Sequence, residues 1–353
     1  MDQAEIISQF EVEGRVHDVI SHGNGHIHDT YHVKTSEEDA PNYLLQKINH
    51  RIFKDVKAMM RNIDQVTTFI RQHFPDKTSL TLIRTTDGQA YLQNQEQYWR
   101  IFLFLEGLIS YDQVEDENLV YEGSRLLGDF LNDLSGLDPQ VLDETIPDFH
   151  NLMMRLDQFE GVLANARSER VSQTSDLVKV VRSLGPQLSE LEVMRKAGYL
   201  TNRITHNDTK LNNVLYDQSG KAQCVIDLDT VMPGLVHYDF GDGIRTACTT
   251  AAEDEADLQL VGFDQDKLRA YCAGYLESTR DMMTDQELDT LNLATPLMSF
   301  IMGVRFFTDF LQDDLYYKTH YPDQNLNRAR AQLHLAQEAW HQRNDFQQLL
   351  RRA

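Results

Sequence analysis

The spacing of apolar residues changes near residue 105, and this change constrains the fold more than any other feature of the sequence. Upstream, short segments rich in β-branched and aromatic residues alternate with glycines and polar clusters. They predict strands at residues 11–20, 30–35, 43–48, 79–84 and 98–105. Between the third and fourth of these segments, apolar residues recur at helical spacing from Val56 until Pro75. We therefore expect a small sheet-rich unit around one helix.

Downstream of this point the apolar spacing is mostly helical. The clearest stripes run over Leu119–Leu134 and Ala329–Trp340. One exception is a pair of short apolar runs, residues 213–216 and 222–226, which flank Asp-Gln-Ser-Gly and predict a β-hairpin. We therefore predict an α+β fold with two lobes. The small β-rich lobe would span residues 1–105, and the larger, mainly helical lobe would span residues 106–353.

A polar segment directly before the predicted hairpin carries the expected chemistry. Its spacing, His206-x-Asp208-x-x-x-x-Asn213, is that of the catalytic loop of protein kinases, and Asp227 follows in VIDLDT. In phosphoryl transfer a loop aspartate accepts the proton of the attacking hydroxyl, while the asparagine and a second aspartate hold Mg²⁺ against the nucleotide phosphates. This predicts Asp208 as catalytic base, Asn213 and Asp227 as metal ligands, and ATP and Mg²⁺ as cofactors. The alternative is a surface loop, because Asn and Asp are common turn residues.

Two features of the first lobe bear on nucleotide binding. Gly23 and Gly25 lie between two predicted strands, where glycine lets backbone N–H groups approach phosphates; a plain Asn-Gly hairpin turn is the alternative. Lys47 lies in the third predicted strand, where a phosphate-pairing lysine is expected. The following helix has no glutamate to orient it, only Asp55 and Asp64, so a solubilising edge-strand lysine is the other interpretation.

Composition excludes several classes of partner. With 33 Lys+Arg against 55 Asp+Glu, the net charge of −22 repels nucleic acid and anionic lipid. The start of the chain lacks the pattern of a signal peptide, and the densest apolar run, Ile101–Leu105, is too short to cross a bilayer. Three unpatterned cysteines suggest a reducing compartment. We expect a soluble cytoplasmic protein, a monomer or weak homo-oligomer, without nucleic-acid or membrane partners.

Several motifs together resemble the aminoglycoside-phosphotransferase and choline-kinase superfamily, which uses the protein-kinase-like fold on small molecules. They are HNDTKLNN, VIDLDT, the glycine turn and DTVMPGLVHYDFGDGIR. Within that superfamily, GNGHIHDTY, IDLDTVMPG, YDFGD and GVRFFTDFL resemble the N-acetylhexosamine 1-kinases. The resemblance implies ATP- and Mg²⁺-dependent phosphorylation of N-acetylglucosamine or N-acetylgalactosamine at the anomeric hydroxyl. The partners would then be ATP and a small sugar.

The same resemblance implies roles for further residues. It places the adenine-binding hinge at the end of the last small-lobe strand, at Phe104, Leu105 and Glu106, and it makes Asp229 a second acidic candidate for the metal. His26 and Arg305 match sugar-binding positions. His26 also belongs to a cluster of histidines, and the alternatives are that this cluster is simply solvated or that it binds zinc. A zinc site is disfavoured because accompanying cysteines and a regular ligand spacing are missing.

Asp309 is a candidate for the same substrate site, because it lies four residues after Arg305 on one predicted helix and the pair would hydrogen-bond a polyol. An ordinary i,i+4 ion pair is the alternative.

Two other functions remain open at this point. The first is a kinase for another small hydroxyl compound, such as an aminoglycoside, choline or a hydroxylated amino acid, since an acidic cleft suits cationic substrates. The second is a kinase-fold binding protein without catalysis. Such proteins usually lack a base or metal residue, whereas Asp208, Asn213 and Asp227 are all present.

Overall fold

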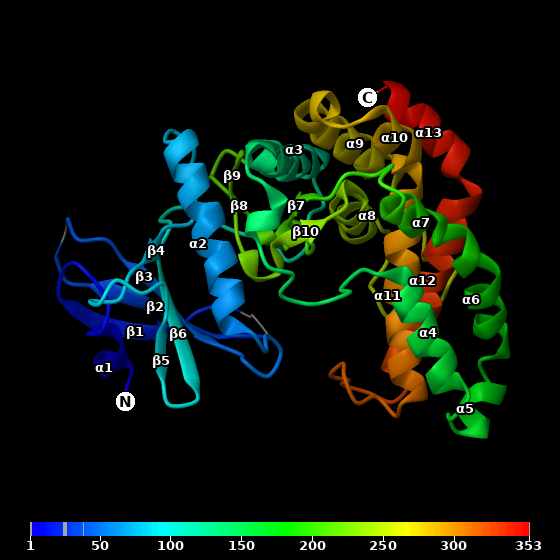
Figure 1. The fold of residues 1–353 in the computed structure, drawn as a ribbon, viewed down its shortest axis with the longest axis horizontal. Helices are drawn as coiled ribbons and strands as arrows, with labels where there is room; N and C mark the ends of the chain where they lie inside the picture. Colours follow the sequence, from blue (N-terminus) through cyan, green and yellow to red (C-terminus); the bar gives the residue numbers. More distant parts are fainter. Residues whose placement is uncertain (1, 24–26, 38, 353) are drawn as a thin grey trace.

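The chain folds into two lobes, and the computed structural model describes residues 2–23, 27–37 and 39–352. A sheet with one long helix forms the first lobe, and a helical assembly forms the second (Figure 1). The N-terminus lies beside the sheet, and the C-terminus lies at the far side of the helical lobe. This arrangement confirms the predicted α+β class with a small sheet-rich lobe and a larger helical lobe.

The small lobe is built on an antiparallel sheet of order β1-β2-β3-β6-β4, with β5 paired to β6. Its elements are α1 (Gln3–Ile7), β1 (Val16–Ser21), β2 (Asp29–Thr35), β3 (Tyr43–Ile48), α2 (Val56–His73), β4 (Leu82–Ile83), β5 (Leu92–Asn94) and β6 (Gln97–Leu103). The sequence pattern located β2 and β3 closely but overestimated β1 and β4. Strand alternation gives the sheet two different faces, because neighbouring side chains point in opposite directions.

One face of the sheet packs under α1, and the other faces α2. Val33, Leu45 and Ile101 belong to the first face and are fully buried against α1. Side chains of α2, such as Met60 and Ile63, join a core that continues into the helical lobe. The helix therefore lies between the sheet and the second lobe, beside β8 and β9 (Figure 1).

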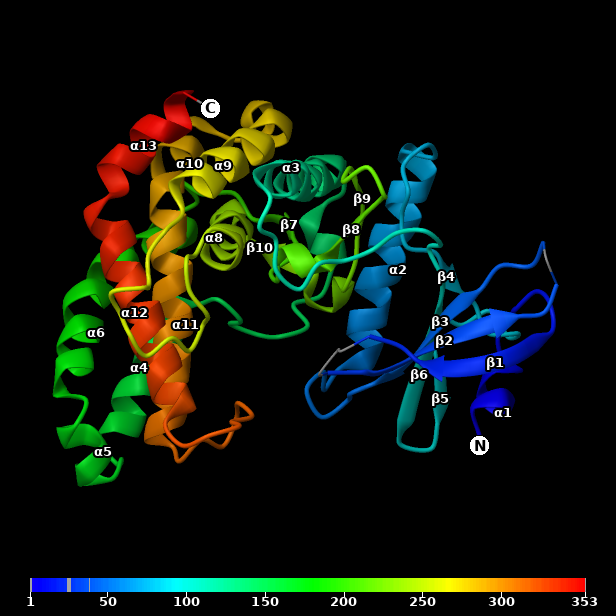
Figure 2. The same cartoon turned by 180° about the vertical axis from the view of Figure 1, so that it is seen from behind.

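The second lobe consists mainly of helices. They are α3 (Glu117–Asp133), α4 (Leu152–Leu163), α5 (Ser168–Ser172), α6 (Ser175–Leu188), α7 (Glu190–Lys196), α8 (Val236–Ala247), α9 (Gln265–Thr279), α10 (Asp285–Thr290), α11 (Ala294–Leu311), α12 (Gln324–His341) and α13 (Arg343–Arg352). Viewed from behind, α11 and α12 run side by side next to α4 and α6 (Figure 2). Gly241 of α8 permits a close approach to α11, since a Cβ there would lie 2.2 Å from the Ala294 carbonyl oxygen.

The helix α11 is the most apolar of the long helices in the described chain. An 18-residue window within Asp285–Leu311 has a mean hydropathy of 1.2, which by length and composition alone would suffice to cross a membrane. However, 72% of it is buried inside the protein, where it packs against α8, α12 and α4. Its apolar side chains are therefore covered by the helical lobe itself.

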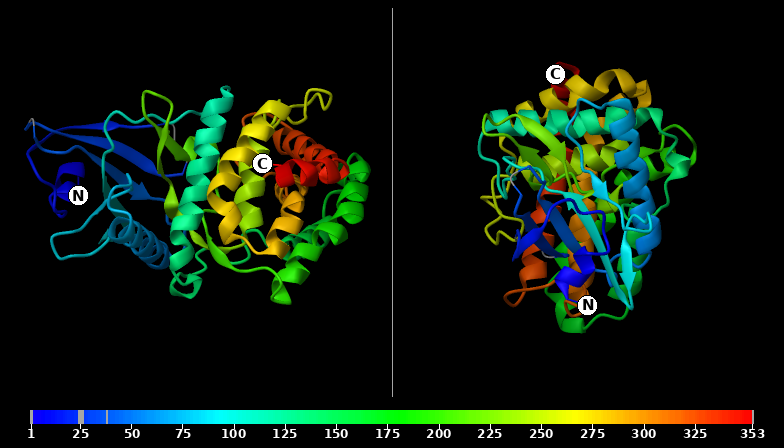
Figure 3. Two further views of the ribbon diagram at one scale, coloured as in Figure 1. Left: turned by 90° about the horizontal axis from the view of Figure 1, so that it is seen from above. Right: turned by 90° about the vertical axis from the view of Figure 1, so that its left-hand side faces the viewer.

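Two small antiparallel pairs interrupt the helices and position the loops between them. Strand β7 (Arg203–Thr205) pairs with β10 (Met232–Gly234), and β8 (Val214–Tyr216) pairs with β9 (Ala222–Val225). The second pair confirms the predicted hairpin. From above, these strands lie between the sheet lobe and the helices (Figure 3). The loop after β7 and the turn after β9 are therefore held at the junction of the two lobes.

Candidate active site

The loop that follows β7 is fixed by a buried carboxylate on α8. Asp239 accepts hydrogen bonds from the backbone N–H groups of His206 at 2.8 Å and Asn207 at 2.7 Å. Burial raises the pKa of Asp239 to about 6, although these N–H groups oppose the shift. Asn207 adopts a left-handed backbone with φ of 64°, a conformation that asparagine tolerates. The loop therefore leaves β7 in one defined direction.

Asp208 and Asn213, the first two residues of the predicted site, lie together. The Asn213 side-chain amide donates to the Asp208 carbonyl oxygen at 2.9 Å and lies 3.4 Å from its Oδ2. Lys210 Nζ lies 3.2 Å from Asp208 Oδ1, and this carboxylate raises the pKa of Lys210. Asp208 remains about one quarter exposed. Its carboxylate is thus anchored on one side and open on the other.

Asp227 lies next to this pair because the hairpin returns the chain to it. The Ile226 N–H donates to the Asn213 carbonyl oxygen at 2.9 Å, and Asp227 follows with a left-handed φ of 60°. Burial, together with the nearby charges of Asp229 and Asp208, raises the pKa of Asp227 to about 7. Among the described residues its carboxylate has no hydrogen-bond or ion-pair partner. Carboxylate crowding of this kind favours binding of a cation.

The oxygen donors of Asn213 and Asp227 suit Mg²⁺. The Asn213 amide nitrogen is used by Asp208, which leaves its Oδ1 as the free donor. In the described part of the chain no group of three or more His, Cys, Asp or Glu side chains could hold a metal by itself. Mg²⁺ is commonly bound by only one or two carboxylates plus substrate phosphates, so this donor set fits a metal that arrives with a nucleotide.

Asp229, the second acidic candidate for the metal, has both oxygens occupied by the small lobe. Arg100 of β6 donates to Oδ1 and, at 3.0 Å, to Oδ2, while His28 Nε2 also contacts Oδ2. Burial disfavours the ionised carboxylate, but Arg100 and His28 outweigh it and hold the pKa of Asp229 well below its usual range. This geometry argues against a metal ligand and makes Asp229 the partner of a buried interlobe ion pair.

Lys47 points away from this network, contrary to the predicted phosphate contact. Its ammonium lies 5.7 Å from the Trp99 ring, and Trp99 is its cross-strand neighbour on β6. The adjacent Gln46 instead accepts from Arg100 Nε at 2.9 Å. A shift of one residue along a strand reverses the face. The small-lobe cation that reaches Asp229 is therefore Arg100, a residue that sequence reasoning missed because it lies on another strand.

Replacing Arg100 by methionine is expected to lower the free energy of unfolding by about 3 kcal/mol, because Asp229 would remain buried without its main counter-ion. Denaturant unfolding of the full chain measures this loss. Lys47→Met on the opposite face of the same sheet is the matched control, with an expected loss below about 1 kcal/mol. Equal losses in both variants would show that the ion pair does not stabilise the lobe contact.

The predicted hinge follows β6 and is fastened to the start of β3. The Phe104 N–H donates to the Asn42 carbonyl oxygen at 2.9 Å, and Glu106 Oε1 accepts from the Asn42 side chain at 2.6 Å. Leu105 packs against the main core. Gly107 ends the segment with a φ of 73°, which suits a sharp change of direction. The adenine-binding role of these residues stays a prediction.

The hinge also contacts a histidine that the sequence pattern did not single out. The Phe104 ring stacks on His32 with centroids 3.9 Å apart, and the His32 Nε2 is buried without a hydrogen-bond partner in the described chain. Of the predicted glycine turn, Gly23 has a φ of 74°, as a tight turn requires. Gly25 and His26 lie outside the described residues.

Arg305 and Asp309, predicted to bind the acceptor together, have different surroundings. Asp309 accepts from the backbone N–H groups of Tyr316 at 2.8 Å and Tyr317 at 2.9 Å, and from Asn325 at 3.0 Å. It is 3% exposed, so it anchors the loop between α11 and α12 and is not free to hold a polyol. Nor do the two residues form the alternative ion pair. The Arg305 guanidinium instead lies over the rings of Phe149, at 5.3 Å, and Tyr317, at 5.7 Å.

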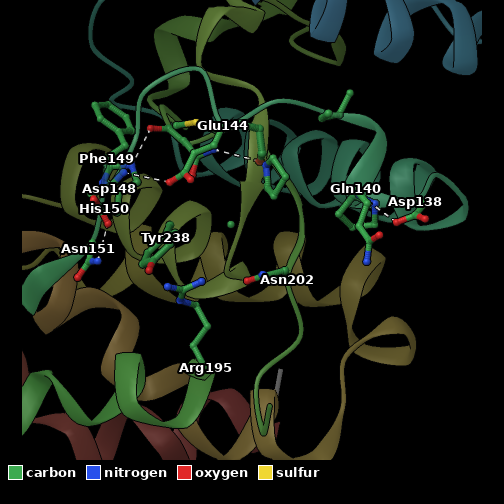
Figure 4. Close-up of a pocket in the computed structure, with 16 residues that line it drawn as sticks. Asp138, Gln140, Glu144, Asp148, Phe149, His150, Asn151, Arg195, Asn202 and Tyr238 are labelled. Carbon is green, nitrogen blue, oxygen red and sulfur yellow. Dashed lines mark hydrogen bonds between the residues drawn. The ribbon is translucent and has the colours of Figure 1, made fainter. Parts of the chain in front are cut away.

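A separate pocket of about 400 Å³ borders the loop that follows β7 (Figure 4). Asn207 contributes to its wall, whereas Asp208, Asp227 and Arg305 do not. Its acidic lining residues are Asp138, Glu144 and Asp148. Figure 4 shows Arg195 and Tyr238 on another side of this pocket, and the Arg195 guanidinium is already paired with Glu192. The pocket is therefore acidic on balance.

Comparisons with solved structures show which proteins share this fold. An aminoglycoside phosphotransferase from Alicyclobacillus acidocaldarius aligns over 100% of this chain and 96% of its own, with a TM-score of 0.66 and 13% identity. Amicoumacin kinase in complex with AMP-PNP and Ca²⁺ aligns over 96% and 94%, with a TM-score of 0.59 and 14% identity. Choline kinase from Streptococcus pneumoniae aligns over 92% and 94%, with a TM-score of 0.53 and 14% identity. At these identities the likeness shows the fold alone.

The sequence itself gives the family. A sequence model of the phosphotransferase enzyme family (APH) matches residues 18–278, which span both lobes from β1 to α9 and include the loop, the hairpin and Asp227. The chain therefore belongs to the APH phosphotransferase family.

Proposed function

We propose that this protein transfers the γ-phosphoryl group of ATP, with Mg²⁺, to the anomeric hydroxyl of N-acetylhexosamines and yields the sugar 1-phosphate. The observation that carries the phosphotransfer is the convergence of Asp208, Asn213 and Asp227 at the junction of the lobes. Membership of a phosphotransferase family supports it. The acceptor is supported by the resemblance of the motifs around residues 206–213 and 227–242 to N-acetylhexosamine 1-kinases.

In this reaction Asp208 accepts the proton of the attacking hydroxyl. Its carboxylate is suited to this because the Asn213 amide and Lys210 orient it while part of it stays open to the acceptor. An anomeric hydroxyl is more acidic than an ordinary alcohol and demands less of a carboxylate base. Asn213 and Asp227 would hold Mg²⁺, which when bound neutralises charge on the transferring phosphoryl group.

The acceptor would lie between Asp208 and the Arg305 side of the helical lobe. Arg305 presents several N–H donors between two aromatic rings, a combination typical of sites that orient small polar ligands. In Figure 1 the loop after α11, which carries Tyr317, extends toward the sheet lobe. These groups would position the sugar, and Asp208 would act on its hydroxyl.

A second candidate is a kinase for a cationic hydroxyl compound. The pocket lined by Asp138, Glu144 and Asp148 favours it, because three carboxylates would attract an ammonium group. Similar folds are found in choline kinase and aminoglycoside phosphotransferase. This alternative places the acceptor in that pocket, whose wall includes Phe149, the ring that Arg305 contacts from elsewhere.

An acceptor panel distinguishes these functions. ATP consumption is measured with N-acetylglucosamine, N-acetylgalactosamine, their parent hexoses, choline and an aminoglycoside, and phosphorus NMR identifies the phosphorylated position. We expect turnover with an N-acetylhexosamine and a product signal coupled to the anomeric proton. Turnover of choline or an aminoglycoside alone would transfer the assignment to the second candidate.

A further inference from the structure

Two arginines on the proposed acceptor side of the helical lobe form no ion pair with a carboxylate in the described part of the chain. Arg305 of α11 lies 5.3 Å from the Phe149 ring, and Arg155 of α4 donates to the Phe149 carbonyl oxygen at 2.9 Å. Burial is the main cause that lowers the pKa of both His150 and Arg155. The charge of Arg305 lowers both further, and that of Arg155 also lowers the pKa of His150, as expected for nearby positive charges. The two therefore flank one aromatic residue as a positive pair.

Most partly buried arginines of this lobe are neutralised. Arg195 pairs with Glu192, Arg203 pairs with Glu287, and Arg245 pairs with Asp242. The chain carries 55 acidic residues, so carboxylate partners are plentiful. A partly buried charge without a partner is unfavourable for folding. Two such charges at one place are more readily explained by function than by stability.

Unused polar atoms surround the same pair. The Arg155 Nε, the Tyr317 hydroxyl and the His150 Nδ1 are buried and have no hydrogen-bond partner among the described residues. Burial and the charge of Arg305 lower the pKa of His150 to about 3, so this imidazole adds no positive charge at neutral pH. Buried polar atoms are normally paired, so a group of three unpaired ones points to a missing ligand.

This cluster is linked directly to the catalytic loop. His150 Nε2 lies 3.2 Å from the carbonyl oxygen of Asn207, the residue immediately before Asp208. The ring of His150 in turn lies 4.3 Å from that of Phe149, the residue between the two arginines. Two contacting side chains, Phe149 and His150, therefore connect the positive pair to the backbone just before Asp208.

We propose that Arg155 and Arg305 form an electrostatic filter that excludes acceptors bearing an ammonium group, which restricts the enzyme to uncharged or anionic hydroxyl compounds. This proposal rests on one part of the proposed function, namely that Asp208 acts as base for a small hydroxyl compound bound on the Arg305 side of the helical lobe. An amino sugar would pass the filter when its amine is acylated, since acylation removes the charge. The filter thus concerns the class of acceptor and does not depend on one particular sugar.

The size of the effect follows from Coulomb repulsion. Two like unit charges about 6 Å apart at an effective dielectric constant of about 20 should disfavour the charged acceptor by roughly 100-fold. Solvent exposure reduces this value, so we expect a preference of at least about tenfold for the acylated form.

Matched acceptors test the filter in the full-length protein. The ratio of kcat/KM is measured for N-acetylglucosamine over glucosamine, and for the acylated over the free form of a simple amino alcohol, at about pH 6.5 where the amines are protonated. Arg305→Gln and Arg155→Gln should each lower these ratios by at least about fivefold, whereas Arg305→Lys should preserve them. Arg182→Gln, which removes an exposed arginine of α6 already paired with Glu160, is the charge-matched control and should leave the ratios unchanged.

The outcomes separate the two proposals. If amines react as well as their acylated forms in the wild-type protein, the filter is overturned. The filter is also overturned if the glutamine variants lower both rates equally, since the arginines would then only support the structure. The enzyme could leave N-acetylhexosamines unphosphorylated but phosphorylate another acylated acceptor with a higher kcat/KM than the corresponding free amine. In that case the sugar assignment is wrong and the filter is supported.

Discussion

Replacing Asp208 by asparagine is expected to reduce kcat by about a thousandfold or more, because the loop would lose the carboxylate proposed to accept the proton of the attacking hydroxyl. Asparagine has nearly the same shape, and its Oδ1 would still face Lys210 as the carboxylate does at 3.2 Å. The contact of Asn213 with the residue 208 carbonyl oxygen would also remain. The affinity for ATP with Mg²⁺ should therefore stay within about threefold of wild type.

Steady-state kinetics with calorimetric titration of the nucleotide checks this prediction. Asp289→Asn is the matched control, because Asp289 is an exposed carboxylate on α10, 3.9 Å from Arg351 and remote from the loop. It should change neither kcat nor nucleotide affinity. Unchanged turnover in Asp208→Asn would remove the central assignment of this site. A parallel loss of ATP affinity would instead show that Asp208 mainly supports the loop.

The two kinds of lobe, the hairpin and the loop that joins Asp208 to Asn213 could be predicted because their signals are local. The strand at residues 43–48 and the hairpin at 214–225 depend on alternation and on turn residues within a few positions. The spacing from Asp208 to Asn213 also lies within one loop, and the hairpin brings Asp227 back to it. Such short-range patterns predict the local backbone structure even when the contacts with distant parts of the chain are unknown.

Sequence patterns do not locate side chains whose contacts are decided by distant partners. Lys47 occupies the expected strand, but the register of β3 turns it toward Trp99, and Gln46 takes the inner position. The sequence predicts Asp229 as a metal ligand, but in the structure its carboxylate is paired with Arg100, which lies 129 residues away in sequence. No local signal indicates such contacts.

Asp309 shows the same limitation. Its spacing from Arg305 suggested a shared ligand, but the loop that follows α11 folds back and uses both of its oxygens. His150, which connects the arginine pair to the catalytic loop, carried no motif at all. Residues that act through packing against a loop become visible only when the tertiary structure is known.

The pair Asp227→Asn and Asp229→Asn separates metal binding from lobe attachment. In Asp227→Asn the Mg²⁺-dependent part of the ATP affinity should fall by roughly 100-fold or more. Removing a residue that only supports a metal ligand already costs up to about 100-fold in metal affinity, and Asp227 would be a ligand itself. Asparagine tolerates the left-handed backbone at this position, where φ is 60°, so the turn after β9 should keep its shape. Removing one of three crowded carboxylates should also leave the free energy of unfolding unchanged or higher.

Asp229→Asn should give the opposite result. Its carboxylate neutralises Arg100 inside the protein, so the asparagine variant should lose about 3 kcal/mol of stability while its ATP affinity still depends on Mg²⁺. Calorimetric titration of ATP with and without Mg²⁺, together with denaturant unfolding of both variants, measures the two effects. If Asp229→Asn abolished the Mg²⁺ dependence and Asp227→Asn preserved it, the assignment of the two carboxylates would be reversed. The buried contact of Asp229 with Arg100 and His28 would then have to open when the nucleotide binds.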